Sequence, residues 1–258
     1  DYNKDGLVDI IVVEKMKTAA FGLPGSVYIL TNIGAAKFKV TSPTALKDLG
    51  MMTSIASIDI NNDEWMDLVI AGKWMPISFV LNDKGSFENS KATEITETAG
   101  LWNALHTVDI DDDGDLDLLC GNEGKNTFYQ KNMKMFVNDF DGNGSLEQII
   151  CQNDGDNYYP IHDIDEMYSQ MPFLKKKYRS YLEMAKADVS SMFGDNAIQT
   201  SKIFEISELA SIILKNDKGI FEKIYLPHEA QYSSIFTFMT QSSKNKGTNI
   251  FMGDRKST

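Results

Sequence analysis

Short apolar runs separated by polar turns recur along most of the chain. Four runs have the length of buried strands and are too short for helices: Ile10–Val13, Leu68–Ala71, Leu118–Cys120 and Gln148–Cys151. Further segments pass from β-type residues through an Asn/Asp/Gly turn to an aromatic residue, which predicts hairpins: Leu30–Phe38, Leu81–Phe87 and Leu214–Phe221. Together these elements predict about four strands in roughly 50 residues, the size of one propeller blade.

The spacing of the elements predicts how the blades follow one another. Residues 1–50 and 51–100 each form most of a blade, and residues 101–130 form a shorter third unit. Residues 135–152 open a fourth blade. After residue 201 strands resume, and Ser234–Thr240 is a further strand. Residues 241–248 take the place of another turn but carry no acids, so no metal is expected there.

The hydrophobic period changes between Asp163 and Phe193. Apolar residues there recur at spacings of three and four, which predicts amphipathic helices. Asp163 or Asp165 is expected to cap the first helix, Pro172 suits the first turn of a second helix, and Gly194 ends the run. We therefore expect propeller blades with metal loops over residues 1–159, a small helical insertion over 160–200, and one or more further blades over 201–258.

A nine-residue acidic motif precedes each of the four apolar runs. Its copies are Asp1–Asp9, Asp59–Asp67, Asp109–Asp117 and Asp139–Glu147, with an acid or Asn at positions one, three, five and nine. Four copies indicate an internal repeat. Carboxylates at alternate positions of a turn suit a hard cation, and Ca²⁺ takes six to eight oxygens in flexible geometry.

The predicted calcium ligands are the side chains at positions one, three, five and nine and the backbone carbonyl at position seven. They are Asp1, Asn3, Asp5, Leu7 and Asp9; Asp59, Asn61, Asp63, Trp65 and Asp67; Asp109, Asp111, Asp113, Asp115 and Asp117; and Asp139, Asp141, Asn143, Ser145 and Glu147.

The motif differs from an EF-hand at position twelve. An EF-hand has a bidentate Glu there and continues as a helix, whereas these copies have Val12, Ile70, Cys120 and Ile150. The loop therefore joins two strands. The copy at 59–67 suits a metal least, because Glu64 replaces the turn glycine and a non-glycine residue at positive φ costs about 1 kcal/mol.

The loops and strands resemble those of the FG-GAP/VCBS-repeat β-propellers, whose blades carry Asp-x-Asp-x-Asp-Gly-x-x-Asp calcium loops. Within that family the chain is most similar to the cartilage-acidic-protein-like group of bacterial surface proteins. Residues 139–145, 170–177 and 226–231 carry this similarity. The resemblance implies an all-β fold, a β-propeller formed here as a partial ring, with a helical insertion near 160–200. It also implies extracellular display, often as a lipoprotein at the outer membrane near nutrient importers, with a protein or a glycan as partner.

The distribution of charge argues against one class of partner, and the position of the cysteines indicates their chemical state. The chain has a net charge of −12, and the acids of the four loops outnumber their single base, Lys4, by 15. Because the acidity lies in the loops and no basic footprint remains, nucleic-acid binding is not supported. Cys120 and Cys151 lie in apolar runs, which favours buried thiols and leaves a disulfide open. No transmembrane run is visible.

Outside the loops, the sequence has no clear catalytic constellation. His106 and His228 stand apart from any nucleophile motif, acids near His162 suit a helix start, and Lys175–Lys177 fit a solvated helix face. Our first hypothesis is a calcium-stabilised, non-enzymatic binding or scaffold module at the cell surface. The alternative is a propeller-fold polysaccharide lyase or glycoside hydrolase. The strand expected before Asp1 is missing, so we expect these residues to belong to a larger protein and not to close a ring alone.

Overall fold

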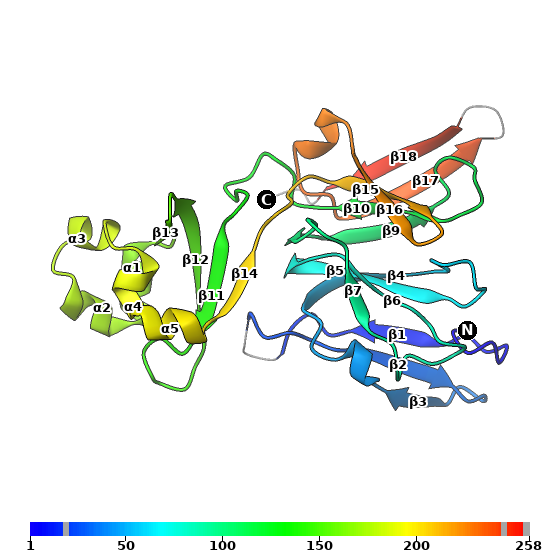
Figure 1. Cartoon of the computed structure of the whole chain (residues 1–258), viewed down its shortest axis with the longest axis horizontal. Helices are drawn as coiled ribbons and strands as arrows, with labels where there is room; N and C mark the ends of the chain where they lie inside the picture. Colours follow the sequence, from blue (N-terminus) through cyan, green and yellow to red (C-terminus); the bar gives the residue numbers. More distant parts are fainter. Residues whose placement is uncertain (18–20, 244–246, 255–258) are drawn as a thin grey trace. The chain divides into compact units, whose positions relative to one another are not determined.

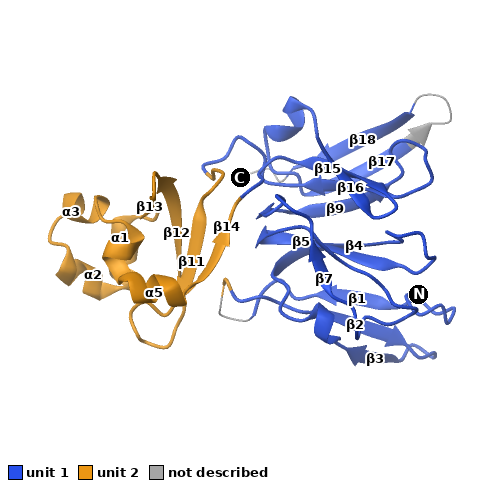
Figure 2. Ribbon diagram, in the orientation of Figure 1, with its two compact units in different colours: residues 1–17, 23–128, 207–258 blue, residues 18–22, 129–206 orange. Residues whose placement is uncertain are grey.

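The computed structural model describes residues 1–17, 21–243 and 247–254. The chain forms two compact units, each with its own core (Figure 2). Unit 1 contains residues 1–17, 23–128 and 207–258, and unit 2 contains residues 18–22 and 129–206. The contacts thus group part of the predicted blade region, residues 129–159, with the helices. The predicted domain boundaries at 159 and 200 remain a prediction.

Unit 1 is built from antiparallel sheets whose strands follow the predicted runs (Figure 1). The first sheet has the order β1-β2-β3, and the second has the order β4-β5-β6-β7, with β8 paired to β5. The bounds are β1 Ile10–Val13, β2 Val27–Asn32, β3 Phe38–Thr41, β4 Met51–Ile58, β5 Asp67–Met75, β6 Ser78–Val80, β7 Ala92–Glu94 and β8 Gly100–Leu101, with a 3₁₀ turn at Thr44–Leu46.

The third sheet joins two segments that lie about ninety residues apart in the sequence. Its order is β16-β15-β10-β9, with β9 at Ala104–Val108, β10 at Asp117–Gly121, β15 at Ile212–Asp217 and β16 at Ile220–Tyr225. This corrects the expected short third unit at 101–130, because the late hairpin β15–β16 completes that sheet. β10 and β15 pair through backbone hydrogen bonds between residues that lie far apart in the sequence. Because backbone groups are the same in almost every residue, no sequence motif near either strand predicts this pairing.

A two-stranded hairpin completes the described part of unit 1. It pairs β17 (Thr237–Ser243) with β18 (Gly247–Gly253) after a 3₁₀ turn at His228–Gln231. The strand expected at 234–240 is present from residue 237. Within the acid-free stretch at 241–248, residues 244–246 lie outside the described residues.

The cores of unit 1 lie between successive sheets and explain why the inner strands are apolar throughout. In β5, Leu68 and Ile70 pack with the first sheet, while Val69 and Ala71 pack with the third. In β10, Leu118 also joins the core shared with the second sheet. Because successive side chains of a strand point to opposite faces, a strand covered on both sides needs a continuous apolar run.

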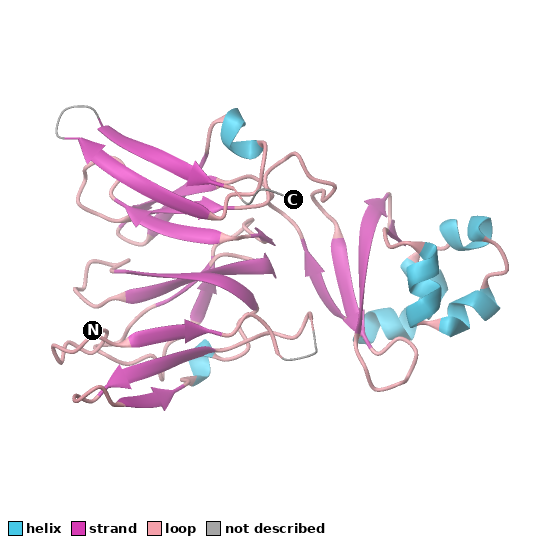
Figure 3. Ribbon diagram, turned by 180° about the vertical axis from the view of Figure 1, so that it is seen from behind, coloured by secondary structure: helices cyan, strands magenta, loops and turns pink. Residues whose placement is uncertain are grey.

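Unit 2 is a four-stranded antiparallel sheet with helices packed on one face (Figure 3). The strand order is β13-β12-β11-β14. The described elements are β11 Lys134–Asn138, β12 Glu147–Asp154, β13 Asn157–Pro160, α1 Ile164–Gln170, α2 Pro172–Lys177, α3 Tyr181–Ala185, α4 Val189–Phe193, α5 Asp195–Thr200 and β14 Lys202–Glu205. Sheet residues Phe136, Ile149 and Cys151 meet the helices in one core.

Local chemistry sets the helix ends. The Asp163 side chain accepts hydrogen bonds from the backbone N–H groups of Asp165 and Glu166 and so caps α1. Pro172 occupies the first turn of α2, where its missing N–H costs nothing. Gly194, at φ +85°, ends α4, and α5 follows it directly. The signals at Asp163 and Pro172 are confirmed, whereas Gly194 ends α4 but not the helical run, which continues as α5.

Cys120 and Cys151 are both buried free thiols. Burial raises the pKa of both thiols well above the ordinary value, so neither is a reactive thiolate at neutral pH.

Candidate metal-binding loops

The four acidic motifs form loops beside the predicted strands. The loop at 59–67 joins β4 to β5, the loop at 109–117 joins β9 to β10, and the loop at 139–147 joins β11 to β12. The loop at 1–9 leads into β1. Every motif is followed by a strand, as expected, and not by the helix of an EF-hand. The first three loops belong to unit 1 and the fourth belongs to unit 2.

The carboxylate at position one organises the turn of each loop. Asp1 accepts hydrogen bonds from the N–H groups of Asp5 and Gly6, both at 2.9 Å. Asp59 and Asp139 accept from positions five and six of their own loops in the same way. The predicted ligand at position one therefore points into the loop.

Position seven donates its backbone N–H to the side chain at position five. The N–H groups of Leu7, Trp65 and Asp115 reach Asp5, Asp63 and Asp113 at 2.9, 2.8 and 2.9 Å, and Ser145 reaches Asn143 at 2.7 Å. The carbonyl groups at position seven stay predicted ligands.

Position three differs among the loops. In the first two loops it is Asn, whose Nδ2 donates to the position-five carboxylate: Asn3 to Asp5 at 2.9 Å, and Asn61 to Asp63 at 3.0 Å. In the fourth loop the direction is reversed, because Asn143 at position five donates to Asp141 at 3.0 Å. In these three loops an amide hydrogen bond therefore stabilises one of the carboxylates without changing its charge.

The third loop is arranged differently. Asp109 Oδ2 accepts from the Gly114 N–H at 3.0 Å, but Asp109 Oδ1 is buried and has no hydrogen-bond partner. Oxygens of Asp109, Asp111 and Asp117 all lie within 4.8 Å of one another. A buried carboxylate oxygen without a donor costs free energy, and a cation at that point would remove the cost.

The fourth loop also brings three acids together. Oxygens of Asp139, Asp141 and Glu147 lie within 4.8 Å of one another. Among the described residues, these two loops are the places where three acidic or metal-binding side chains converge so closely. The loops at 1–9 and 59–67 have Asn at position three, and their third acidic ligand is at position five instead.

The turn residues adopt the left-handed backbone that the motif predicts. Position six has φ between +84° and +95° at Gly6, Gly114 and Gly144. Glu64 holds the same place with φ +68°, so the second loop carries the expected strain. The strain lies at the loop that the sequence ranks as the poorest metal site.

The acid at position nine joins each loop of unit 1 to its outer hairpin. Asp67 accepts the Ile60 N–H at 2.9 Å on one oxygen and the Asn82 N–H at 2.6 Å on the other. Asp117 accepts Ile110 and Asn216 in the same way, both at 2.8 Å. In the first loop, Asp9 accepts Tyr2 at 3.1 Å and Asn32 at 2.9 Å. Position nine therefore has a structural role besides its predicted metal ligation.

Asn32, Asn82 and Asn216 occupy equivalent positions in the three hairpins, and each donates its backbone N–H to the acid at position nine of its loop. We call each of these asparagines, with its hydrogen bonds, a clasp; from the sequence they were expected only to be turn residues. The Asn82 Oδ1 accepts the Gly85 N–H at 2.8 Å, and its Nδ2 donates to Met66 O at 3.0 Å and Tyr2 O at 2.9 Å. Tyr2 belongs to the preceding loop. A sequence pattern could have indicated this role, because each hairpin has an Asn two or three positions before its turn glycine, at Asn32, Asn82 and Asn216.

Contacts between neighbouring loops place the first three along one edge of unit 1 (Figure 1). Lys4 Nζ lies 3.7 Å from Glu64 and 4.4 Å from the centroid of the Trp65 ring. The Asn62 Nδ2 donates to Asp115 at 2.8 Å. A cation bound in one loop would therefore act on the electrostatics of its neighbour.

Burial shifts the ionisation of the position-nine acids. It raises the pKa of Asp67, Asp117 and Glu147, although backbone N–H donors partly offset the effect. Asp111 has the opposite shift, because its hydrogen bond to Lys215 lowers its pKa. The Lys215 Nζ lies 2.5 Å from Asp111 Oδ2 and so places a positive charge beside the third loop.

Other residues with candidate chemistry have structural partners. His106 Nε2 lies 3.0 Å from Thr240 Oγ1. Lys177 donates to the carbonyls of Ser191 at 2.6 Å and Met192 at 3.1 Å, at the end of α4.

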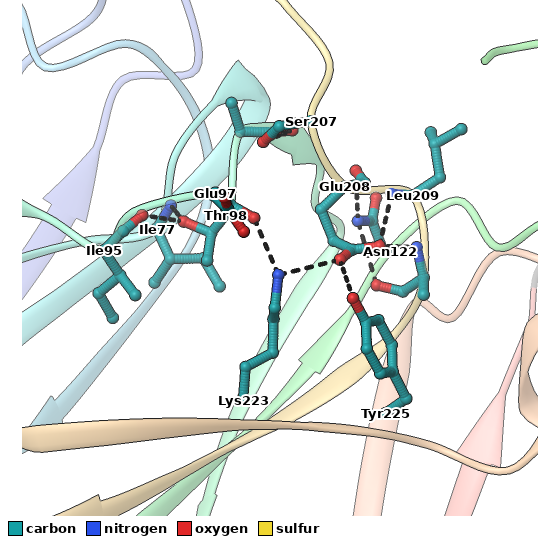
Figure 4. A network of polar contacts seen from close by, with 12 residues as sticks. Ile77, Ile95, Glu97, Thr98, Asn122, Ser207, Glu208, Leu209, Lys223 and Tyr225 are labelled. Carbon is teal, nitrogen blue, oxygen red and sulfur yellow. Dashed lines mark hydrogen bonds and ion pairs between the residues drawn. The ribbon is translucent and has the colours of Figure 1, made fainter. Parts of the chain in front are cut away.

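A cluster of polar side chains lies where the chain returns to the third sheet, between β10 and the β15–β16 hairpin (Figure 4). The Glu208 carboxylate accepts the Tyr225 hydroxyl at 3.0 Å and lies 3.3 Å from Lys223 Nζ. Asn122 Nδ2 donates to Glu208 O at 3.1 Å, and its Oδ1 accepts the Leu101 N–H at 3.0 Å. These bonds hold the returning chain beside β10, so the charged cluster is explained by the fold.

Residues 1–70 and 59–120 match the model of the FG-GAP-like repeat. These matches support an FG-GAP repeat protein. The matched segments contain the first three loops and the clasp residues Asn32 and Asn82 but not Asn216, and the FG-GAP repeat family is generally non-enzymatic. No curated protein matches the chain. No helix among the described residues is long and apolar enough to cross a membrane.

Proposed function

We propose that this FG-GAP repeat chain is a calcium-stabilised, non-enzymatic binding or scaffold module of a cell-surface protein. The observation that carries the proposal is the third loop. There, Asp109 Oδ1 is buried without a hydrogen-bond partner, and carboxylate oxygens of Asp109, Asp111 and Asp117 lie within 4.8 Å of one another. Oxygen-only donors of this kind suit a hard divalent cation.

The residues present fit Ca²⁺ by their chemistry. In the third loop the side chains of Asp109, Asp111, Asp113 and Asp117 and the carbonyl of Asp115 would hold the ion. The other loops would use the matching positions. When bound, Ca²⁺ supplies positive charge that offsets the crowded carboxylates. The acid at position nine meanwhile holds the loop to its outer hairpin through its two backbone hydrogen bonds.

The loop contacts support a stabilising role for the ions. The Asn82 clasp and the Asn62–Asp115 hydrogen bond connect loops of neighbouring sheets. A loop made rigid by its ion therefore also fixes the edge of the next sheet. Binding to the folded state alone stabilises it by mass action.

The proposal includes extracellular display, which rests on the resemblance to the FG-GAP/VCBS-repeat propellers. Calcium sites of extracellular modules bind in the range of roughly 10⁻⁴–10⁻³ M, so the proposal expects affinities of that order. We extend the proposal to a lipoprotein of the outer membrane with a protein partner, or a glycan partner, near a nutrient importer. Its support is the resemblance of residues 139–145, 170–177 and 226–231 to the cartilage-acidic-protein-like group.

Calorimetric titration with CaCl₂ tests the proposal on the parent, Asp109→Asn and Asp112→Asn. Both variants remove one charge from the same loop, but Asp112 at position four is not a predicted ligand. We expect Asp109→Asn to lose the tightest site and Asp112→Asn to retain it. If the parent shows no binding up to about 10 mM Ca²⁺, ten times the extracellular range, the calcium assignment is wrong. Equal losses in both variants would mean that net charge and not ligation governs binding.

A further inference from the structure

Unit 2 contains a cavity that has no part in the acidic loops. Its volume is about 350 Å³, within the range of pockets that bind small molecules. The β12–β13 hairpin lines one side, and α1, α3 and α4 supply the floor. All its lining residues belong to unit 2.

The floor is formed largely by methionines. Met167, Met184 and Met192 come from three different helices, and each is at most 3% exposed. Methionine side chains adapt to the shape of a ligand, and their sulfur atoms make favourable contacts with aromatic rings. The floor therefore suits a flat apolar body.

The side formed by the hairpin carries polar groups with a definite charge preference. Gln152 and Asp154 lie two residues apart on β12 and so share one face, and Tyr159 on β13 pairs with Gln152. Asp154 is the charged member, and none of the described lining residues is a lysine or arginine. A carboxylate and a tyrosine ring both attract a cation.

His162 lines the cavity without adding positive charge. Its Nε2 accepts the Ile150 N–H at 2.9 Å, which places the ring proton of the neutral imidazole on Nδ1. Burial lowers the pKa of His162, so the ring is neutral at pH 7. The electrostatics of the cavity are therefore set by Asp154.

We propose that this cavity binds a small amine with an aromatic body, the ring against the three methionines and the ammonium group beside Asp154 and Tyr159. This is independent of the calcium loops, because none of the lining residues belongs to one. The site would give unit 2 a recognition function of its own.

The test uses three probes of similar shape and different charge: phenethylamine, 2-phenylethanol and 3-phenylpropionate. Methyl NMR of the ¹³C-methionine-labelled whole chain reports binding, with Met184 and Met192 assigned by Leu substitution. We expect phenethylamine to shift Met184 and Met192 but not Met51, which is buried in unit 1. We also expect it to bind more tightly than the alcohol, and the alcohol more tightly than the carboxylate.

Two pairs of variants make the test specific. Asp154→Asn should weaken phenethylamine binding roughly two- to fivefold, as expected for one exposed charge pair, and leave the alcohol unchanged. Asp156→Asn, which alters a nearby acid outside the cavity, should change neither. Ala185→Trp should fill the cavity and abolish binding, whereas Lys186→Trp at the next position should not. Absence of shifts at Met184 and Met192, or equal binding of the amine and the carboxylate, would overturn the proposal.

Discussion

The Asn82 clasp offers a direct test of how the sheets of unit 1 are held together. Its side chain is 2% exposed and makes three hydrogen bonds, with the Gly85 N–H and the carbonyls of Met66 and Tyr2. A typical hydrogen bond contributes about 0.5–1.5 kcal/mol net, and a buried carbonyl left unpaired costs about 1–3 kcal/mol. Asn82→Ala should therefore reduce the free energy of unfolding by about 3 kcal/mol.

Asn32 is a matched control within the same repeat. It makes the equivalent bonds to Gly34 and Val8, but no bond of its side chain to a neighbouring loop is seen among the described residues, and it is not fully buried. Asn32→Ala should therefore cost about 1 kcal/mol. Asn89→Ala, at an exposed position of the same connection as Asn82, should cost less than about 0.5 kcal/mol.

Urea unfolding followed by Trp fluorescence, in saturating calcium, measures all three variants. If Asn82→Ala is no more destabilising than Asn32→Ala, the extra contact with Tyr2 contributes nothing to stability. If both variants differ from the parent as little as Asn89→Ala does, the hydrogen bonds of these asparagines do not stabilise the sheets.

Further expectations concern the loops and the absence of catalysis. Chelation should lower the melting temperature by roughly 5 °C or more. Asp113→Ala should remove more of this calcium dependence than Asp63→Ala, since the third loop has more acidic ligands; the reverse order in thermal melts would refute the ranking. Because burial raises the pKa of Asp117, its protonated form is favoured as pH falls through that raised pKa, so protons compete with the cation. Stabilisation by calcium should therefore be larger at pH 7 than at about pH 4, which is close to the ordinary pKa of an aspartate, and a constant gain would contradict this. Lys215→Met should tighten calcium binding at the third loop several-fold, because Lys215 pairs with Asp111; weaker binding in a titration would show that Lys215 helps to form the site. Assays on polysaccharides and glycosides with calcium present should show no turnover, and activity lost on changing a residue outside the loops would restore the enzyme alternative.

Local chemistry made much of this protein readable from its sequence. The acidic motifs, the strands that follow them and the turn glycines depend on residues within nine positions of one another. The caps at Asp163 and Pro172 are equally local. The strain at Glu64 also followed from one residue type at one position of the repeat. In each case the side chains that determine the backbone are its immediate sequence neighbours.

The tertiary structure decided which of these elements belong together. It paired β15 with β10 and grouped the fourth loop with the helices of unit 2. It also revealed the bonds of Asp67 to Asn82 and of Asp117 to Asn216, and the ion pair between Lys215 and Asp111. These partners lie 15 to 104 positions apart, and backbone N–H groups, which every residue except proline carries, make most of the bonds. Sequence therefore specified the turn chemistry of each repeat, while the packing of sheets against one another selected the distant partners.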